Sequence, residues 1–274
     1  MTTDVASGPG RVPSHPGFEE WTPRSMSELL RQISEVSARD PQRRYLWRGH
    51  GDAGWGFAPS LYRRLLQGLG RVPTEEDVAD YEADLIMRSI ARGFYDGESH
   101  ASTLAQLQHH GAATRLLDVT WDPMIALWFA VEGAQHSGVD AALFAVDITE
   151  ASVFSPTDPE PKSWSMIVET ERPGSLFVYQ PPWSEERVKA QRAAFIASIL
   201  DGNEKPNMAF GIPVDRPFGT RIVVPAALKA ETTTYLERNC GLHWEAMYPD
   251  LGGFAQAHGP ARPLRPRDQL MRFG

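Results

Sequence analysis

The sequence predicts an α+β domain in which a helix-rich N-terminal half packs on a small mixed or antiparallel sheet. Two observations predict it. Segments with the apolar spacing of amphipathic helices dominate the first half, and short apolar runs typical of strands dominate the second half. In addition, 274 residues with 42% hydrophobic side chains are enough to bury a sizeable core.

Four segments in the first half of the chain show helical patterning. Residues 25–37 repeat apolar side chains at helical spacing, with Ser27 as a candidate cap, and a short helix is expected at 104–109 before Gly111. The longest predicted helix covers 74–94, because Thr74 precedes three acidic residues that favour a helix N-terminus. A fourth, strongly apolar helix is expected at Pro123–Val131.

Four other segments read as strands. The segment at 44–49 reads as a strand that ends at a glycine, and the run at 141–148 has the composition of a buried strand. Shorter strands are expected at 176–179 and 221–224. The second of these is closed by a proline, and a helix is expected to follow it over 226–238.

The ends of the chain differ in composition from its centre. Residues 1–24 are rich in Ser, Gly and Pro and are interpreted as a flexible leader, and 259–274 as a Pro/Arg-rich tail. Residues 25–258 are expected to form a single domain. The leader lacks the apolar segment of a secretory signal, and no apolar run is long enough to span a bilayer, so we expect a cytoplasmic protein without a membrane partner.

Charge and cysteine content exclude several classes. The net charge of −8 does not favour broad attraction to nucleic acid, although a local basic groove is still open. Cys240 is the single cysteine, which excludes an intrachain disulfide and a Cys-rich metal site, and small packing is the simpler role for it. The eight histidines are scattered and show no zinc-site spacing, so no metal is expected.

Residues Gln108 to Asp118 carry the densest collection of polar chemistry. Two imidazoles, an arginine, a hydroxyl, a carboxylate and Gly111 occur in eleven residues that lead into the apolar helix at 123–131. Ionisable loops next to a rigid element are common binding sites. Because adjacent side chains point in different directions, only one of His109 and His110 is expected to face a given site.

Several ordered blocks resemble the FRG-domain family, which is named for an aromatic-Arg-Gly motif. The blocks are Trp47-Arg48-Gly49, Pro59 to Arg63, Gln108 to Asp118 with Thr120, Asp122-Pro123 with Ala126 to Ala130, Arg187-Val188 with Gln191 and Phe195, and Gly241-Leu242 with Tyr248 to Leu251. The resemblance spans roughly Ser27 to Phe254. It implies a common domain, but it does not by itself imply a reaction.

A second resemblance is to the ADP-ribosyltransferase fold, in which an aromatic-Arg-Gly strand binds NAD and a later strand precedes an apolar helix. Trp47-Arg48-Gly49 is similar to the first element, and Thr114–Thr120 followed by Pro123–Val131 is similar to the second. An arginine offers a planar set of donors to a pyrophosphate. The Ser-Thr-Ser triplet and the late Glu-x-Glu pair of that fold are missing here.

This resemblance implies a set of site residues. Glu245, chosen over Glu231 and Glu237, would be the catalytic glutamate, with His110 as a second catalytic group. The residues expected to bind NAD, treated as a substrate, are Arg48, Gly49, Ser60, Arg63, His109, Gly111, Thr114, Arg115, Asp118 and Thr120.

Purely structural roles are open for the same residues. Arg48 could pair with Asp118 and join the first strand to the central loop, and Arg115 could pair with Asp118 within that loop. Thr120 could belong to the cap of the helix that begins at Pro123.

Three functions follow as hypotheses. The first is an NAD-consuming ADP-ribosyltransferase-like enzyme that acts on a macromolecular target, such as a bacterial toxin or a phage-defence effector. The second is a non-catalytic nucleotide-binding or sensor module that uses the same cleft. A nucleic-acid-processing enzyme is a third option, with Arg63, Arg64 and Arg71 as phosphate contacts. A glutamate that faces the cleft distinguishes the first hypothesis from the second.

Overall fold

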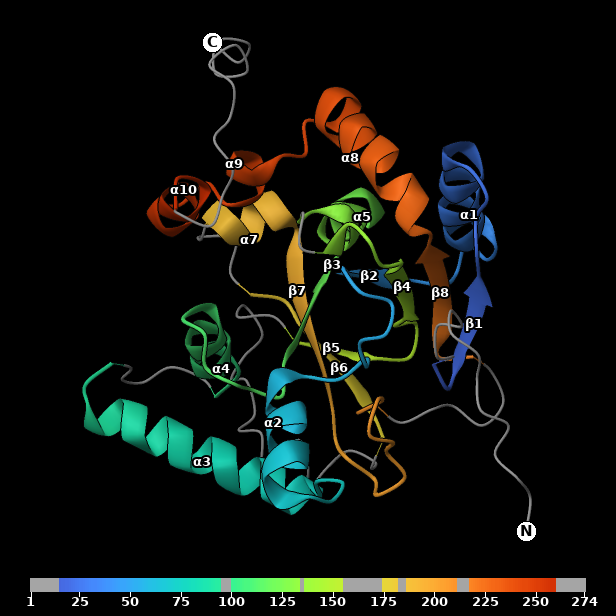
Figure 1. Cartoon of the computed structure of the whole chain (residues 1–274). Coiled ribbons are helices and arrows are strands. Elements are labelled where there is room, and N and C mark those ends of the chain that lie inside the picture. Colours follow the sequence, from blue (N-terminus) through green and yellow to red (C-terminus); the bar gives the residue numbers. More distant parts are fainter. Residues whose placement is uncertain are drawn as a thin grey trace.

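A single mixed sheet, covered by helices on both faces, organises the protein (Figure 1). The computed structural model describes residues 15–94, 100–133, 136–154, 174–181, 186–210 and 217–259. Within these residues the sheet has eight strands in the order β1-β8-β4-β2-β3-β7-β6-β5. The strands are β1 (Phe18–Trp21), β2 (Tyr45–His50), β3 (Leu117–Thr120), β4 (Ala141–Asp147), β5 (Ser152–Phe154), β6 (Leu176–Tyr179), β7 (Ala193–Ser198) and β8 (Gly219–Val224).

The centre of the sheet is antiparallel and its two edges are parallel. The pairs β1–β8 and β5–β6 run parallel, and the five pairs between them run antiparallel. Every residue of β4 and β8 is buried, as expected for central strands that are covered on both faces.

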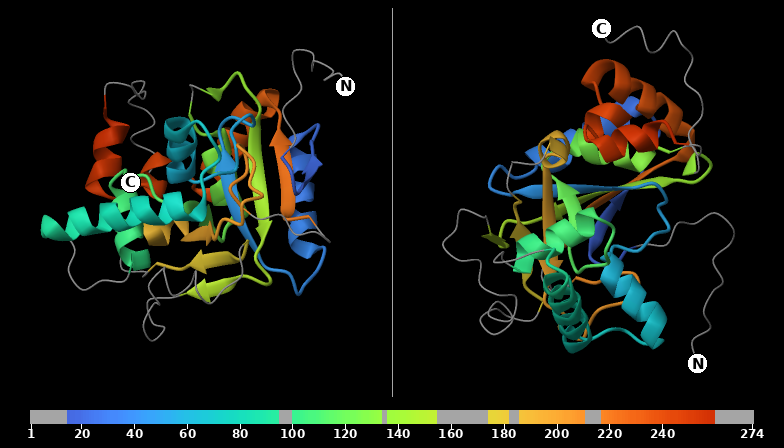
Figure 2. Two further views of the ribbon diagram at one scale, coloured as in Figure 1. Left: turned by 90° about the horizontal axis from the view of Figure 1, so that it is seen from below. Right: turned by 90° about the vertical axis from the view of Figure 1, so that its left-hand side faces the viewer.

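One face of the sheet is covered by α1 (Met26–Ala38), α5 (Pro123–Val131) and α8 (Ala226–Cys240), as Figures 1 and 2 show. Helix α5 packs in the middle, and its side chains Ala126, Leu127 and Trp128 are fully or almost fully buried. It begins where Asp122 caps the N–H of Met124 and Pro123 occupies the first turn.

The opposite face is covered by α2 (Ser60–Leu69), α3 (Glu75–Ala91) and α4 (His100–His109). Helix α3 begins with a capping box, in which Thr74 and Asp77 bind each other's backbone N–H groups. Its N-terminal half packs on the main core through Val78, and its C-terminal half packs through Ile86 on a smaller cluster with α4, β6 and β7.

Three short helices lie together beyond the end of β7 (Figure 1). They are α7 (Glu186–Gln191), α9 (Trp244–Met247) and α10 (Leu251–Ala257). Arg187 of α7 donates two hydrogen bonds to Asp250, which caps α10 through the N–H of Gly253. The C-terminal helices are therefore fastened to the segment that leads into β7.

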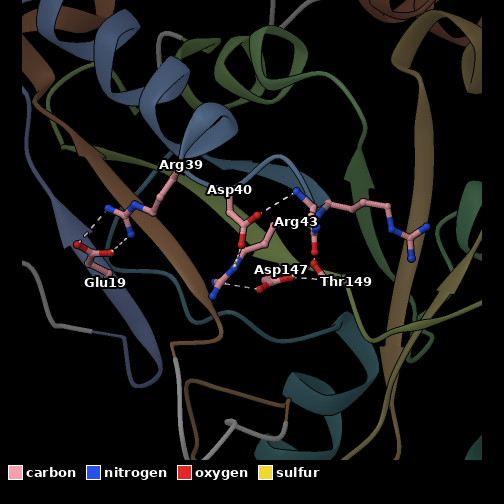
Figure 3. A network of polar contacts seen from close by, with 8 residues as sticks. Glu19, Arg39, Asp40, Arg43, Asp147 and Thr149 are labelled. Atoms are coloured by element: carbon pink, nitrogen blue, oxygen red, sulfur yellow. Dashed lines mark hydrogen bonds and ion pairs between the residues drawn. The ribbon is translucent and has the colours of Figure 1, made fainter.

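Polar contacts hold the first end of β2 in place (Figure 3). Arg43, just before the strand, is 3.2 Å from the buried carboxylate of Asp147 at the end of β4. Arg39, after α1, pairs with Glu19 of β1 at 2.6 Å. These contacts fix the approach to β2 at the end opposite Arg48 and Gly49, so the strand enters the sheet with a defined register.

The predicted fold class is confirmed, with corrections to its elements. The helix at 123–131 and the strand at 176–179 have the predicted bounds, and the long helix ends at Ala91 rather than at 94. Ser25, not Ser27, accepts the capping hydrogen bond of α1. The sheet is larger than expected, because β3, β5 and β7 add to it and β1 forms within residues assigned to the leader. The predicted tail beyond Gly259 lies outside the described residues.

Candidate functional site

The strands that carry Arg48 and Asp118 meet at one point and then separate. Strand β2 pairs with β4 along all six of its residues, but with β3 only at Trp47 and Thr120. Beyond this pair, the backbones of β2 and β3 make no further ladder contact among the described residues. The gap between the two strands is where the Arg48 side chain lies.

Arg48 bridges this gap with its guanidinium group. Nη1 donates to the backbone oxygen of Asp118 at 2.6 Å and lies 3.8 Å from its carboxylate. Nε donates to Nε2 of His50 at 2.9 Å. The predicted meeting of Arg48 with Asp118 is therefore confirmed, but the shorter contact is to the backbone, and the Asp118 side chain is 65% exposed.

Burial changes the pKa values of both Arg48 and its hydrogen-bond partner His50. Burial lowers the pKa of the Arg48 guanidinium, Asp118 opposes that change, and nearby Arg63 adds to it. Burial, followed by the charge of Arg48, lowers the pKa of His50 well below its ordinary value. His50 is therefore neutral at physiological pH and can accept a hydrogen bond from the arginine.

Gly49 is required by helix packing. A Cβ atom at this position would lie 2.0 Å from the backbone oxygen of Ala126 and 2.6 Å from the nitrogen of Ala130. Only a residue without a side chain lets α5 approach β2 this closely. Gly49, which was expected to bind NAD, therefore has a packing role as well.

A cavity of about 460 Å³ opens beside these strands. Its size is within the range of roughly 300–1,000 Å³ found for small-molecule sites. Strands β2, β3 and β7 and helices α4, α5 and α7 contribute to its wall, together with Tyr248 directly after α9. The lining residues are Trp47, Arg48, Gly49, Gly51, Trp55, Gln108, His109, Asp118, Val119, Thr120, Ala126, Phe129, Glu132, His136, Arg187, Val188, Gln191, Ala193, Phe195 and Tyr248.

The cavity combines aromatic surfaces with a few charged groups. Trp55 is 45% exposed and stands edge-on to His136, with 4.9 Å between the ring centroids. Arg187 lies over the Tyr248 ring at 5.0 Å while it is paired with Asp250. The carboxylates in the wall are those of Asp118 and Glu132. The cavity can thus hold a planar ring against an aromatic face and an anion against Arg48.

Half of the predicted NAD-binding residues are brought together here. Arg48, Gly49, His109, Asp118 and Thr120 all line the cavity. The Thr120 hydroxyl donates to the backbone oxygen of Gln191 at 2.7 Å and accepts from the N–H of Asp122 at 3.1 Å. Thr120 therefore supports the start of α5, as expected, and also joins β3 to the segment before β7.

Arg115 lies elsewhere, which corrects two predictions. Its side chain is 4% exposed and binds Glu82 of α3 at 2.5 Å and Glu75 at 2.7 Å. Its ion pairs are thus with glutamates of α3 and not with Asp118, and it does not line the cavity. Thr114, also fully buried, bonds to the side chain of Gln108 and to the N–H of Leu116. Both residues hold the segment before β3 in place.

The other expected ligand contacts also lie outside the cavity lining. Ser60 begins α2 and accepts a hydrogen bond from the N–H of Thr114 at 3.3 Å. Arg63 donates to the backbone oxygen of Ala58 at 3.0 Å. Gly111 lies two residues after the end of α4, and its φ of +92° is a left-handed conformation that glycine adopts readily. These residues shape the fold around the site.

The two predicted catalytic residues are not in the cavity wall. His110 is exposed and stands edge-on to His109, whose ring does reach the cavity. Glu245 lies on α9, where the nearby Tyr248 reaches the wall instead. The carboxylate that sequence reasoning missed is Glu132, which follows α5 directly. Its place immediately after the helix adjoining Gly49 was the available signal.

Two further structural findings bear on the site. The described part of the chain contains no group of three His, Cys, Asp or Glu side chains placed to hold a metal ion. Among its helices, none has the length and apolar character needed to cross a membrane.

Comparison with known proteins gives one match. Residues 43–139 match the family model of the FRG domain. The matched region contains β2, β3 and α5 and therefore Arg48, Asp118 and Glu132, whereas Arg187, Gln191 and Tyr248 lie outside it. No curated protein and no solved structure matches the chain.

Proposed function

We propose that this protein, whose residues 43–139 carry an FRG domain, binds NAD in the cavity beside Arg48 and transfers ADP-ribose from it to a macromolecular acceptor. The observation that carries the proposal is the position of Arg48. Its guanidinium is held between two strands at the wall of an aromatic-rich cavity, with a glutamate in the same wall.

The binding step is supported by the hydrogen-bond donor of Arg48 that is still available to a ligand. Nε and Nη1 are committed to His50 and to the backbone of Asp118, and Nη2 has no acceptor among the described residues. A charged donor in a partly desolvated wall is suited to a phosphate oxygen. Trp55, Phe129 and Tyr248 supply aromatic surface for the planar rings of a dinucleotide.

The transfer step requires a carboxylate near the sugar. The bond between the ribose anomeric carbon and the nicotinamide nitrogen breaks, and its electron pair leaves with nicotinamide. The acceptor supplies the new bond to that carbon and loses a proton. Positive charge on the sugar is highest in the transition state, where a fixed carboxylate stabilises it. Glu132 takes this role in the proposal, in place of Glu245.

One observation favours the second candidate, a nucleotide-binding module without chemistry. The last side chain of α7, which lines the cavity, is the amide of Gln191, and its nitrogen donates to the backbone oxygen of Met247 at 3.0 Å. An amide carries no charge with which to stabilise a cationic sugar. If Glu132 does not act, the same cavity binds a nucleotide without consuming it.

Nicotinamide release from NAD distinguishes the two candidates. We expect the wild-type protein to release nicotinamide, and Glu132→Gln to lose at least about a hundredfold in rate while it still binds NAD. Arg48→Ala should lose binding. Glu245→Gln is the matched control, because it removes the same charge from a glutamate outside the cavity lining.

The measured nicotinamide release and NAD binding distinguish the transferase from the binding module. Release by the wild type and by Glu245→Gln, but not by Glu132→Gln, supports the transferase. Binding of NAD without release by any variant supports the binding module. No thermal stabilisation of the wild type by NAD would overturn both.

A further inference from the structure

We infer that His50 is a positioning residue, which holds the Arg48 side chain in the orientation that binds ligand. The inference rests on the proposed function only in taking Arg48 as a ligand-binding group. It assigns a role to the last residue of β2, which lies outside the cavity wall and two positions beyond Arg48.

The geometry places His50 behind the arginine. Residues two apart on a strand project from the same face, so Arg48 and His50 are neighbours on one side of β2. His50 is 2% exposed, and its Nε2 is 2.9 Å from Nε of Arg48. Because an arginine nitrogen can only donate, the histidine must accept.

This hydrogen bond fixes the tautomer of His50. An imidazole that accepts at Nε2 carries its proton at Nδ1. Protonation of both nitrogens is opposed first by burial, then by the positive charge of Arg48, and further by His15, Arg63 and Arg221. The neutral form therefore persists, and His50 continues to accept the hydrogen bond across the physiological pH range.

Stability alone does not account for a histidine here. Nδ1 is buried and has no hydrogen-bond partner among the described residues. An unsatisfied buried donor is destabilising. The ring packs edge-on to Phe144, with 4.9 Å between centroids, and lies 6.3 Å from Phe57. A phenylalanine would fill this aromatic site without the unsatisfied group, so the contact to Arg48 is what a histidine provides.

Two contacts then define the guanidinium plane. Nε is held by His50, and Nη1 is held by the backbone oxygen of Asp118 across the strand gap. When both hydrogen bonds are formed, the guanidinium cannot turn, and the N–H groups of Nη2 point in a fixed direction. Without His50, the guanidinium can turn about its terminal bonds, and ligand binding must then order it again.

The test measures the dissociation constant for NAD by calorimetry in four proteins: wild type, Arg48→Ala, His50→Phe and His50→Gln. We expect His50→Phe to weaken binding about tenfold, as for loss of a hydrogen bond to a charged group. His50→Gln keeps an acceptor at a similar reach and should bind within about threefold of wild type. At pH 7, His50→Phe removes the unsatisfied Nδ1 but leaves Nε of Arg48 without its acceptor, so we expect its heat stability to stay close to that of the wild type, and His50→Gln, which buries amide N–H groups, should be less stable.

The variants distinguish the positioning role of His50 from NAD binding by Arg48. If Arg48→Ala weakens NAD binding and His50→Phe does not, the positioning role is wrong and the proposed function stands. If Arg48→Ala binds NAD as tightly as wild type, the proposed function is wrong. The tautomer is tested without ligand by nitrogen-15 NMR of the histidine rings. Protonation of His50 at Nε2 overturns the inference whatever NAD does, and it decides the case if His50→Phe does not fold.

Discussion

Gly49 of β2 lies against the backbone of Ala126 in α5, so closely that a Cβ atom would be 2.0 Å from the carbonyl oxygen. We therefore expect Gly49→Ala to push α5 away from the sheet and to lower the free energy of unfolding by about 3 kcal/mol or more. Urea unfolding measures this loss. Gly68→Ala is the control, because its added methyl group meets nothing within 4 Å on α2.

The control should change stability in the opposite direction. Gly68 lies within a helix, where alanine is favoured over glycine by roughly 0.5–1 kcal/mol. If Gly49→Ala unfolds at the same urea concentration as wild type, the close packing of α5 on β2 is wrong, and so is the cavity wall built on it.

The buried Arg115–Glu82 pair gives a second stability prediction. Both side chains are 5% exposed or less, and Glu82 also accepts from the N–H of Arg115 at 3.0 Å. Removing Glu82 leaves the buried Arg115 charge with Glu75 as its remaining ion-pair partner, so Glu82→Leu should cost about 3 kcal/mol. The exposed pair Arg88–Asp84 is the matched control, and Asp84→Ala should cost less than about 1 kcal/mol.

The same pair separates folding from ligand binding. In the double variant Arg115→Met with Glu82→Leu, both charges are gone, so we expect much of the stability to return. Because Arg115 does not line the cavity, this double variant should bind NAD as the wild type does. A large loss of affinity in a stable double variant would contradict the placement of Arg115.

Arg192 offers a test of backbone strain beside the cavity. It joins α7 to β7 with a φ of +46°, a conformation that favours glycine, and it pairs with Asp122 at 3.1 Å. Arg192→Ala loses the ion pair and keeps the strain, whereas Arg192→Gly loses the pair and relieves the strain. Arg192→Gly should therefore be more stable than Arg192→Ala by about 1 kcal/mol. Equal unfolding midpoints would show that the conformation carries no strain.

Elements with local signals were predictable from the sequence. The helix at Pro123–Val131 has its predicted bounds, because Asp122 and Pro123 mark its start and its apolar run ends at Glu132. Strands β5 and β7 were not predicted, since three to six residues of mixed size carry little pattern of their own. Strand β7 is defined by pairing on both sides, with β3 and with β6.

Predictions of the site depended on which residues meet across the fold. The convergence of Arg48 with Asp118 was predicted, because each belongs to a recognisable block. Arg115 was assigned to a nearby acid in the sequence, but its partner Glu82 lies 33 residues away. Glu132 directly follows a predicted helix and Tyr248 belongs to a recognised block, but neither position shows that the side chain faces the cavity. That depends on how α5 and the segment after α9 pack in the fold.

The last prediction concerns pH and His50. The pKa of His50 is well below its ordinary value in the folded protein, because of burial and then Arg48. Below about pH 6.5 the unfolded chain therefore binds a proton that the folded protein does not, and stability falls as pH falls, by at most about 1.4 kcal/mol per pH unit. His50→Phe should lose this component, so its stability relative to wild type should rise from pH 7.5 to pH 5.5. Urea unfolding at the two values measures the difference, and the other histidines cancel because both proteins contain them. A relative stability that stays constant would mean that His50 titrates normally, and then it could not remain the acceptor for Arg48 in acid.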